Sequence, residues 1–212
     1  MDLPEHFSVA LFLAMISTGL AEIPSNPYHL VDLESLHAGI FFDIRYATTN
    51  NFMHQQLYPL PKAYLHEDAA ARLLEVQKDL HDRGLGLKVF DGYRPLSVQQ
   101  KMWDLVHDRR YVANPSVNRG RHSRGTAVDV TLVDGQGHEL EMPTKFDDFT
   151  AKAHQDCNDL PKIQKKNRAL LREVMEKHGF EPLNSEWWHF DLKGWYRYPV
   201  LDVDFTALAP TP

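Results

Sequence analysis

Two short segments of the sequence place ionisable side chains among apolar neighbours, in a pattern that can bind a metal ion. His122 lies in a polar loop that leads into an extended run, and Asp129 lies within that run between two valines. Further along, Glu186 and His189 are embedded among aromatic residues. Two histidines and one aspartate are good zinc ligands, and three protein ligands leave a fourth position for water, as in catalytic zinc sites. Glu186 is then a candidate base for deprotonating that water.

Each of these residues also has an interpretation that needs no metal. The chain contains 12 histidines, and most histidines in proteins lie at the surface or are hydrogen-bonded in the core. Asp129 could cap a turn, although a buried carboxylate without a partner is costly. The two tryptophans beside His189 could simply belong to the core. Neither segment is a strict ligand motif such as His-Glu-x-x-His, so spacing alone leaves both interpretations open.

The composition limits the class of protein. Hydrophobic residues make up 43% and charged residues 25% of the 212 residues, which excludes disordered, collagen-like and multi-span membrane classes. A net charge of -6 without basic runs argues against a nucleic-acid partner. The single cysteine, Cys157, excludes an intramolecular disulfide, and no orienting group favours a catalytic role for its thiol. Because no repeat or linker divides the chain, residues 28–205 are expected to form one domain, followed by a tail at 206–212.

The elements that must position these residues can be predicted from periodicity. Apolar residues recur at helical spacing in residues 66–84, 97–106 and 161–179, and Ser97 to Gln100 has the spacing of a capping box. Extended runs are expected at residues 42–47, 87–90, 126–133 and 188–192. Helices and strands interleave without a regular strand-helix-strand alternation, which predicts an α+β fold. We expect a small central, mostly antiparallel sheet flanked by helices, with the metal site at the sheet.

Residues 1–21 differ from the rest of the chain. An apolar run at residues 9–16 is followed by small residues up to Ala21, which is typical of a secretory signal peptide and too short for a membrane span. The lead segment contains Asp2 and Glu5 and no lysine or arginine, unlike most signal peptides, so a buried amphipathic N-terminal helix or a misplaced start is the alternative. We expect a periplasmic protein without stable membrane insertion after signal removal, with the cytoplasm as the alternative location.

The two chemical segments together form a more specific pattern. His-x-x-Gly-x-Ala-x-Asp, followed about sixty residues later by Glu-x-x-His, resembles the zinc peptidases that include bacterial DD-carboxypeptidases and D-alanyl-D-alanine dipeptidases. The likeness to the dipeptidases is closer, because further segments match in the same order over roughly residues 28 to 200. These segments are residues 45–52, 91–95, 146–147 and 167–168.

The resemblance implies a role for each chemical residue. It implies that one zinc ion is held by His122, Asp129 and His189, with Glu186 as general base. It also implies that Arg94 stabilises the tetrahedral oxyanion, where a permanent positive charge meets developing negative charge. The alternative for Arg94 is a surface ion pair.

The resemblance further implies that Tyr46 and Asp147 hold the free amino group of a dipeptide substrate. Taken alone, Tyr46 could be a half-buried strand aromatic and Asp147 a solvated loop acid. One departure is Gly120, because the family usually has serine two positions before the first ligand. The missing side chain affects the expected dipeptide preference more than hydrolysis itself.

The sequence therefore predicts a zinc enzyme that hydrolyses D-alanyl-D-alanine, or a close D,D-dipeptide, in peptidoglycan metabolism. The alternative enzyme is a zinc DD-carboxypeptidase or peptidoglycan endopeptidase that acts on longer stem peptides. A third possibility is a non-catalytic zinc protein, as hedgehog-type relatives of this fold suggest. The presence of Glu186 and Arg94 argues against that third possibility.

Overall fold

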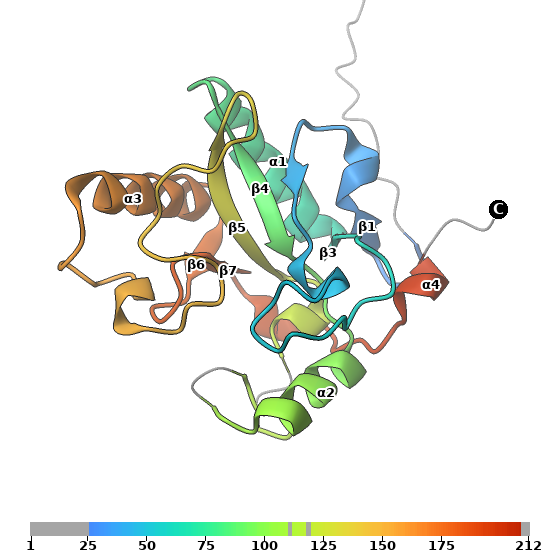
Figure 1. Ribbon diagram of the computed structural model, residues 1–212. Helices are drawn as coiled ribbons and strands as arrows, with labels where there is room; N and C mark the ends of the chain where they lie inside the picture. Colours follow the sequence, from blue (N-terminus) through green and yellow to red (C-terminus); the bar gives the residue numbers. More distant parts are fainter. Residues whose placement is uncertain (1–25, 110–111, 118–119, 209–212) are drawn as a thin grey trace, which may run out of the picture.

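The computed structural model describes residues 26–109, 112–117 and 120–208 (Figure 1). The predicted signal peptide, residues 1–21, lies outside the described residues. Within the described ranges, no helix combines the length and apolar character needed to cross a membrane.

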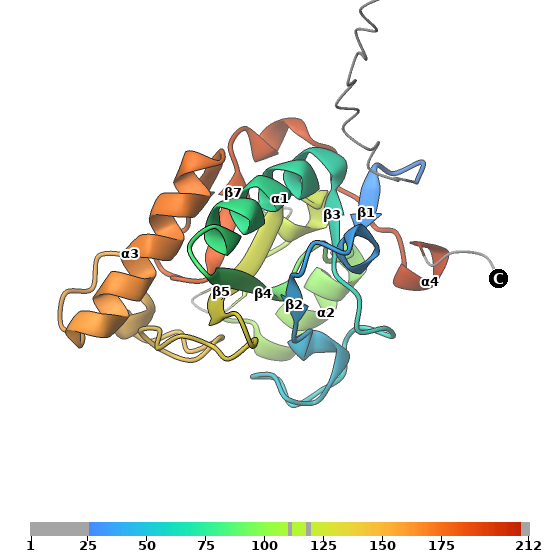
Figure 2. The ribbon, with the colours of Figure 1, turned by 90° about the horizontal axis from the view of Figure 1, so that it is seen from above.

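A five-stranded mixed sheet forms the centre of the molecule (Figures 1 and 2). In spatial order its strands are β2 (Phe41–Phe42), β4 (Leu85–Asp91), β5 (Ala127–Asp134), β7 (His189–Leu192) and β6 (Phe180–Pro182). Only β2 and β4 pair in parallel, and the other three pairings are antiparallel. This arrangement confirms the predicted α+β fold with a mostly antiparallel sheet.

The three long helices occupy the predicted segments. They are α1 (Glu67–His81), α2 (Leu96–Val106) and α3 (Lys162–Lys177). Helix α1 packs against β4, α3 packs against β5 and β6, and the two helices contact each other, so they cover one face of the sheet. Helix α2 lies apart from them, beyond the ends of the central strands (Figure 1).

The two faces of strand β5 have different roles: one belongs to the hydrophobic core and the other carries Asp129. Its first seven residues are buried, and successive side chains on a strand point to opposite faces. Val128, Val130 and Leu132 therefore share one face, and they belong to the same hydrophobic cluster as the buried residues of α1 and α3. Asp129 and Thr131 point to the other face.

A second, two-stranded sheet lies beside the first. It pairs β1 (Leu30–Asp32) with β3 (Tyr64–His66) in antiparallel fashion, and neither strand was predicted. Near the other end of the chain, α4 (Phe205–Leu208) packs Phe205 against Tyr58 with a ring separation of 4.7 Å. The segment predicted as a tail thus begins inside a short helix.

Two local predictions are wrong. The expected strand at residues 42–47 ends at Phe42, and Arg45–Ala47 form a 3₁₀ turn. Short-range bonds replace sheet pairing there, because the Ala47 N–H donates to the Ile44 carbonyl at 3.0 Å. The capping box is also absent: Ser97 lies inside α2, and its N–H donates to Asp202 Oδ1 at 2.8 Å. In both cases the backbone finds an acceptor that the pattern did not indicate.

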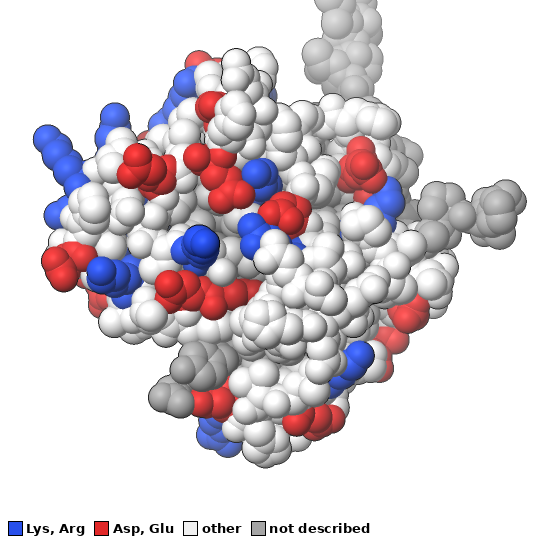
Figure 3. All heavy atoms as spheres, viewed as in Figure 1, with Lys and Arg blue, Asp and Glu red and all other residues white. Residues whose placement is uncertain are grey.

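Charged side chains of both signs are interspersed on the face of the molecule shown in Figure 3. Elsewhere in the molecule, ion pairs join different elements, such as Lys88 with Glu139 at 3.0 Å and Lys177 with Asp79 at 2.6 Å. Each of these pairs has one partner that is open to solvent, and ion pairs near the surface contribute about 0–1 kcal/mol each, so the buried core supplies most of the stability.

Candidate active site

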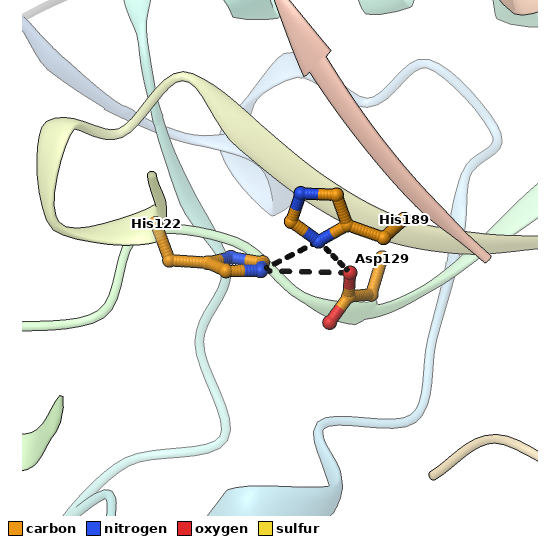
Figure 4. A group of neighbouring side chains, drawn as sticks. All are labelled: His122, Asp129 and His189. Atoms are coloured by element: carbon orange, nitrogen blue, oxygen red, sulfur yellow. Dashed lines mark hydrogen bonds and ion pairs between the residues drawn. The ribbon is translucent and has the colours of Figure 1, made fainter. Parts of the chain in front are cut away.

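The three predicted metal ligands come together beside the paired strands β5 and β7 (Figure 4). Asp129 on β5 lies opposite His189 on β7 in the strand register, and His122 comes from the 3₁₀ turn just before β5. His189 Nδ1 lies 3.0 Å from Asp129 Oδ1, and His122 Nε2 lies 3.2 Å from His189 Nδ1 and 3.5 Å from Asp129 Oδ1. All three side chains are buried.

Gly125, the glycine of the first motif, allows the tight turn that places His122 beside Asp129 and His189. Gly125 ends the 3₁₀ turn with a left-handed φ of 68°. A Cβ atom there would lie 2.7 Å from Leu30 Cδ2 and 2.9 Å from the His66 backbone nitrogen, so only glycine fits without displacing β1 and β3. The Gly125 carbonyl also accepts a hydrogen bond from the His66 N–H at 2.7 Å. The turn that carries His122 is therefore tied to the second sheet.

Each histidine is oriented by an acceptor on its outer ring nitrogen. His122 Nδ1 lies 2.8 Å from the Gly92 carbonyl, and His189 Nε2 lies 3.1 Å from Asp191 Oδ1. Because each of these nitrogens donates its hydrogen to its acceptor in the neutral ring, His122 presents the lone pair of Nε2 and His189 that of Nδ1. Both lone pairs face Asp129.

This donor set fits a zinc ion. The ligand atoms of His122, Asp129 and His189 all lie within 4.8 Å of one another. Ligands that lie about 2.0–2.2 Å from one tetrahedral zinc ion are about 3.3–3.6 Å apart, close to the separations of 3.0–3.5 Å found here. Two imidazoles and one carboxylate are also the chemistry that zinc prefers.

The electrostatics of the group favour a positive charge among the ligands. Burial alone would raise the pKa of Asp129, but the two neighbouring histidines hold that pKa below its ordinary value. Burial alone would lower the pKa of His189, but the charges of Asp191 and Asp129 raise it well above its ordinary value. The protein thus supplies the negative potential that stabilises a cation at this position.

Glu186 lies beside the ligand group without belonging to it. Its Oε2 is 3.9 Å from His189 Nδ1, and its side chain is 20% exposed. Loss of water contacts raises the pKa of Glu186, an effect that the charge of His189 partly opposes. A carboxyl group whose pKa is raised holds a proton more readily, which suits a group that accepts a proton and then returns it.

The Arg94 guanidinium is buried, which excludes the surface ion pair. Its Nη2 and Nε donate to Asp91 Oδ2 at 2.6 and 3.2 Å, and its Nη1 donates to Gln99 Oε1 at 2.8 Å. The group also lies over the Tyr46 ring, 5.1 Å from its centroid. Asp91 is itself fixed, since its Oδ1 accepts the Tyr58 hydroxyl hydrogen at 2.7 Å. Arg94 therefore carries a positive charge in a preset orientation.

Tyr46 and Asp147, which are 101 positions apart, form a direct pair. The Tyr46 hydroxyl lies 3.1 Å from both carboxylate oxygens of Asp147. Loss of water contacts raises the pKa of Asp147 well above its ordinary value, and the nearby charge of Asp129 raises it further. Tyr46 opposes this shift by donating its hydrogen. A cation that arrives beside Asp147 would supply the counter-charge that the ionised carboxylate needs.

One cavity of about 210 Å³ joins these groups. It is smaller than the ~300–1,000 Å³ of typical pockets for drug-sized ligands, so it suits a small substrate. Its lining includes all seven residues predicted from the sequence: Tyr46, Arg94, His122, Asp129, Asp147, Glu186 and His189.

Comparison with known proteins identifies the family. The model of the D-ala-D-ala dipeptidase family, Peptidase M15, matches residues 26–206. The chain belongs to this family.

Curated relatives agree with this assignment. The D-alanyl-D-alanine dipeptidase of Escherichia coli K12 is 34% identical over 183 residues, which cover 86% of this chain and 94% of the relative. The D-alanyl-D-alanine dipeptidase of Enterococcus faecium is 29% identical over 196 residues, which cover 82% and 95%. Among solved structures, a zinc complex of the vancomycin-resistance D,D-pentapeptidase VanY is 17% identical, covers 63% of this chain and 75% of its own, and has a TM-score of 0.42.

Gly120, at the position where the dipeptidase family usually has serine, has a backbone conformation that favours glycine. Gly120 lines the cavity and has a left-handed φ of 68°. A Cβ atom there would lie 2.8 Å from Ser123 Oγ. A serine at this position would strain the backbone and displace Ser123, so the glycine is coupled to the local packing.

The Asn167-Arg168 segment, which resembled the dipeptidase family, has a structural role. Asn167 Nδ2 donates to the Glu141 carbonyl at 2.9 Å. Arg168 donates to the carbonyls of His154 and Cys157 at 2.7 and 2.8 Å. Both residues lie on α3, and they therefore fasten to this helix the long connection between β5 and α3, which contains Asp147.

Proposed function

We propose that this protein is a zinc-dependent dipeptidase that hydrolyses D-alanyl-D-alanine or a close D,D-dipeptide. The observation that carries the proposal is that one small cavity holds a two-histidine, one-aspartate ligand group, an adjacent carboxyl group, a fixed guanidinium and a second carboxylate paired with a tyrosine. These groups match the needs of peptide hydrolysis, and membership of the D-ala-D-ala dipeptidase family supports the substrate.

The residues of the chain divide the chemistry among them. Bound by His122, Asp129 and His189, a zinc ion would supply Lewis-acid activation of water and of the peptide carbonyl. Glu186 takes one proton from the attacking water, whose oxygen bonds to the carbonyl carbon. As the carbon-nitrogen bond breaks, Glu186 returns that proton to the leaving amine. Arg94 meets the negative charge that develops on the carbonyl oxygen.

The amino end of the substrate determines whether the enzyme prefers a dipeptide or a longer peptide. A free dipeptide has an ammonium group close to the scissile bond, and Asp147 with Tyr46 can pair with it by a charge-assisted hydrogen bond. A stem peptide has an uncharged amide at that point and needs room for more chain. This difference favours a dipeptidase over a carboxypeptidase or an endopeptidase. A non-catalytic zinc protein would need neither Glu186 beside the ligands nor a preset Arg94.

Incubation of the purified protein with D-alanyl-D-alanine, and separately with a stem pentapeptide, tests this function. We expect cleavage of the dipeptide, loss of activity with a chelator and recovery on adding zinc. His189→Ala should lose both bound zinc and hydrolysis, whereas His81→Ala, at an exposed position on α1, should keep both. Full zinc content and activity in His189→Ala would contradict the ligand assignment, and preferred cleavage of the pentapeptide would favour a carboxypeptidase.

We also propose that the protein is exported to the periplasm. The support is the apolar run at residues 9–16 and the small residues that follow it up to Ala21. N-terminal sequencing of the protein from its native host should then find a mature chain that begins near Glu22 in the periplasmic fraction. An intact Met1 in cytosolic material would contradict export.

A further inference from the structure

The outer nitrogen of His189 is hydrogen-bonded to a charged group, whereas that of His122 is hydrogen-bonded to a neutral one. His122 Nδ1 lies 2.8 Å from the neutral Gly92 carbonyl and 3.7 Å from Asp91 Oδ2, a carboxylate oxygen already bound by Arg94. His189 Nε2 lies 3.1 Å from Asp191 Oδ1, its direct hydrogen-bond partner. Asp191 is two residues further along β7 than His189, so the two side chains lie on the same face of the strand. Asp191 is 1% exposed, and a carboxylate buried to this degree is costly unless its oxygens are paired.

A guanidinium pairs with the second oxygen of this carboxylate. Arg121 Nη1 donates to Asp191 Oδ2 at 2.6 Å. The Arg121 guanidinium also lies 5.1 Å from the centre of the Trp195 ring, which holds it in place. Asp191 therefore links two side chains: its Oδ1 binds His189 and its Oδ2 binds Arg121. The other ring nitrogen of His189, Nδ1, is the one that faces the cavity.

We propose that Asp191 is the positioning residue that fixes His189 as a metal ligand, that Arg121 holds Asp191 in place, and that the pair strengthens zinc binding. The inference rests on the metal site of the proposed function. A carboxylate that accepts the outer N–H of a ligating histidine fixes the ring orientation and makes the inner nitrogen a stronger donor. Because Asp191 acts on His189 and does not itself face the ligand group, its effect should appear in metal affinity before it appears in substrate recognition.

Chelator competition measures this effect directly as the zinc dissociation constant. In Asp191→Asn, the side-chain volume is kept but the negative charge is lost, and we expect zinc binding to weaken by about 10- to 100-fold. In Arg121→Gln, the carboxylate remains beside His189 without its cation, and we expect a smaller weakening. Glu181→Gln is the matched control, because Glu181 is exposed on β6 directly opposite Asp191 in the strand register, and its zinc affinity should equal that of the wild type.

Cobalt substitution gives a second readout that is independent of activity. The visible absorption bands of bound cobalt report the ligand geometry, so they should change in Asp191→Asn and stay unchanged in Glu181→Gln. A merely structural role of Asp191 would lower the melting temperature of the metal-free protein while leaving zinc affinity and cobalt bands unaltered.

The outcomes separate this inference from the proposed function. Absence of zinc binding in the wild-type protein would refute the metal site and the inference together. Tight binding in the wild type with the same dissociation constant in folded Asp191→Asn would overturn the inference alone. If Asp191→Asn does not fold, Arg121→Gln decides: weaker zinc binding supports the role of the pair, and unchanged binding overturns it.

Discussion

Glu186→Gln is expected to retain one zinc ion per chain while its kcat falls by at least ~10²-fold. The amide has the size of the carboxylate, so the cavity and the ligand group should keep their shape. It cannot accept a proton, however, so the attacking water keeps its proton and the leaving amine receives none from this side chain. The proposed ligand group does not include Glu186, whose Oε2 lies 3.9 Å from His189 Nδ1.

Metal content and steady-state kinetics on the same protein preparation check this expectation. Glu181→Gln serves again as the control for the chemical change, since its side chain is exposed on β6. Loss of zinc from Glu186→Gln would mean that Glu186 is a ligand, and unchanged kcat would mean that another group is the base.

The second large effect concerns the free amino group of the substrate. N-acetyl-D-alanyl-D-alanine has no ammonium to pair with Asp147, and the loss of such a buried pair costs about 2–5 kcal/mol. The ratio of kcat/KM for the free dipeptide to that for the acetylated one should therefore be about 30 to several thousand. Comparable kcat/KM values for the two substrates would overturn the dipeptidase assignment in favour of a carboxypeptidase.

The variant Asp147→Asn tests whether Asp147 is the residue that recognises the substrate ammonium group. Asp147 has a left-handed φ of 62°, a conformation that asparagine tolerates better than alanine, so the variant should fold. We expect it to cleave the free dipeptide poorly and to lose most of the discrimination against the acetylated one, because neither substrate then finds a charged partner. Asp148→Asn is the neighbouring control and should discriminate as the wild type does. A full preference for the free dipeptide in Asp147→Asn would place the ammonium elsewhere.

The sequence alone determined the elements whose causes are local. Helix α1 follows from apolar spacing and from acidic residues at its start, and its predicted range ends at Gly84, three residues beyond His81. The proximity of the three proposed ligands could also be predicted, because His122, Asp129 and His189 fall in two compact motifs and the structure brings their ligand atoms within 4.8 Å of one another. Gly125 belongs to the first motif for a steric reason, since a side chain there would strike β1 and β3.

Only the tertiary structure decided the interactions between residues that are distant in the chain. The pairing of Tyr46 with Asp147 depends on a 3₁₀ turn where periodicity predicted a strand, because local hydrogen bonds replaced sheet pairing after Phe42. The orientation of His189 depends on Asp191, whose own charge is balanced by Arg121 from a loop 70 positions earlier. Residue types and spacing indicate which groups can bind a metal, but which nitrogen faces the cavity depends on acceptors that only folding brings within hydrogen-bond distance.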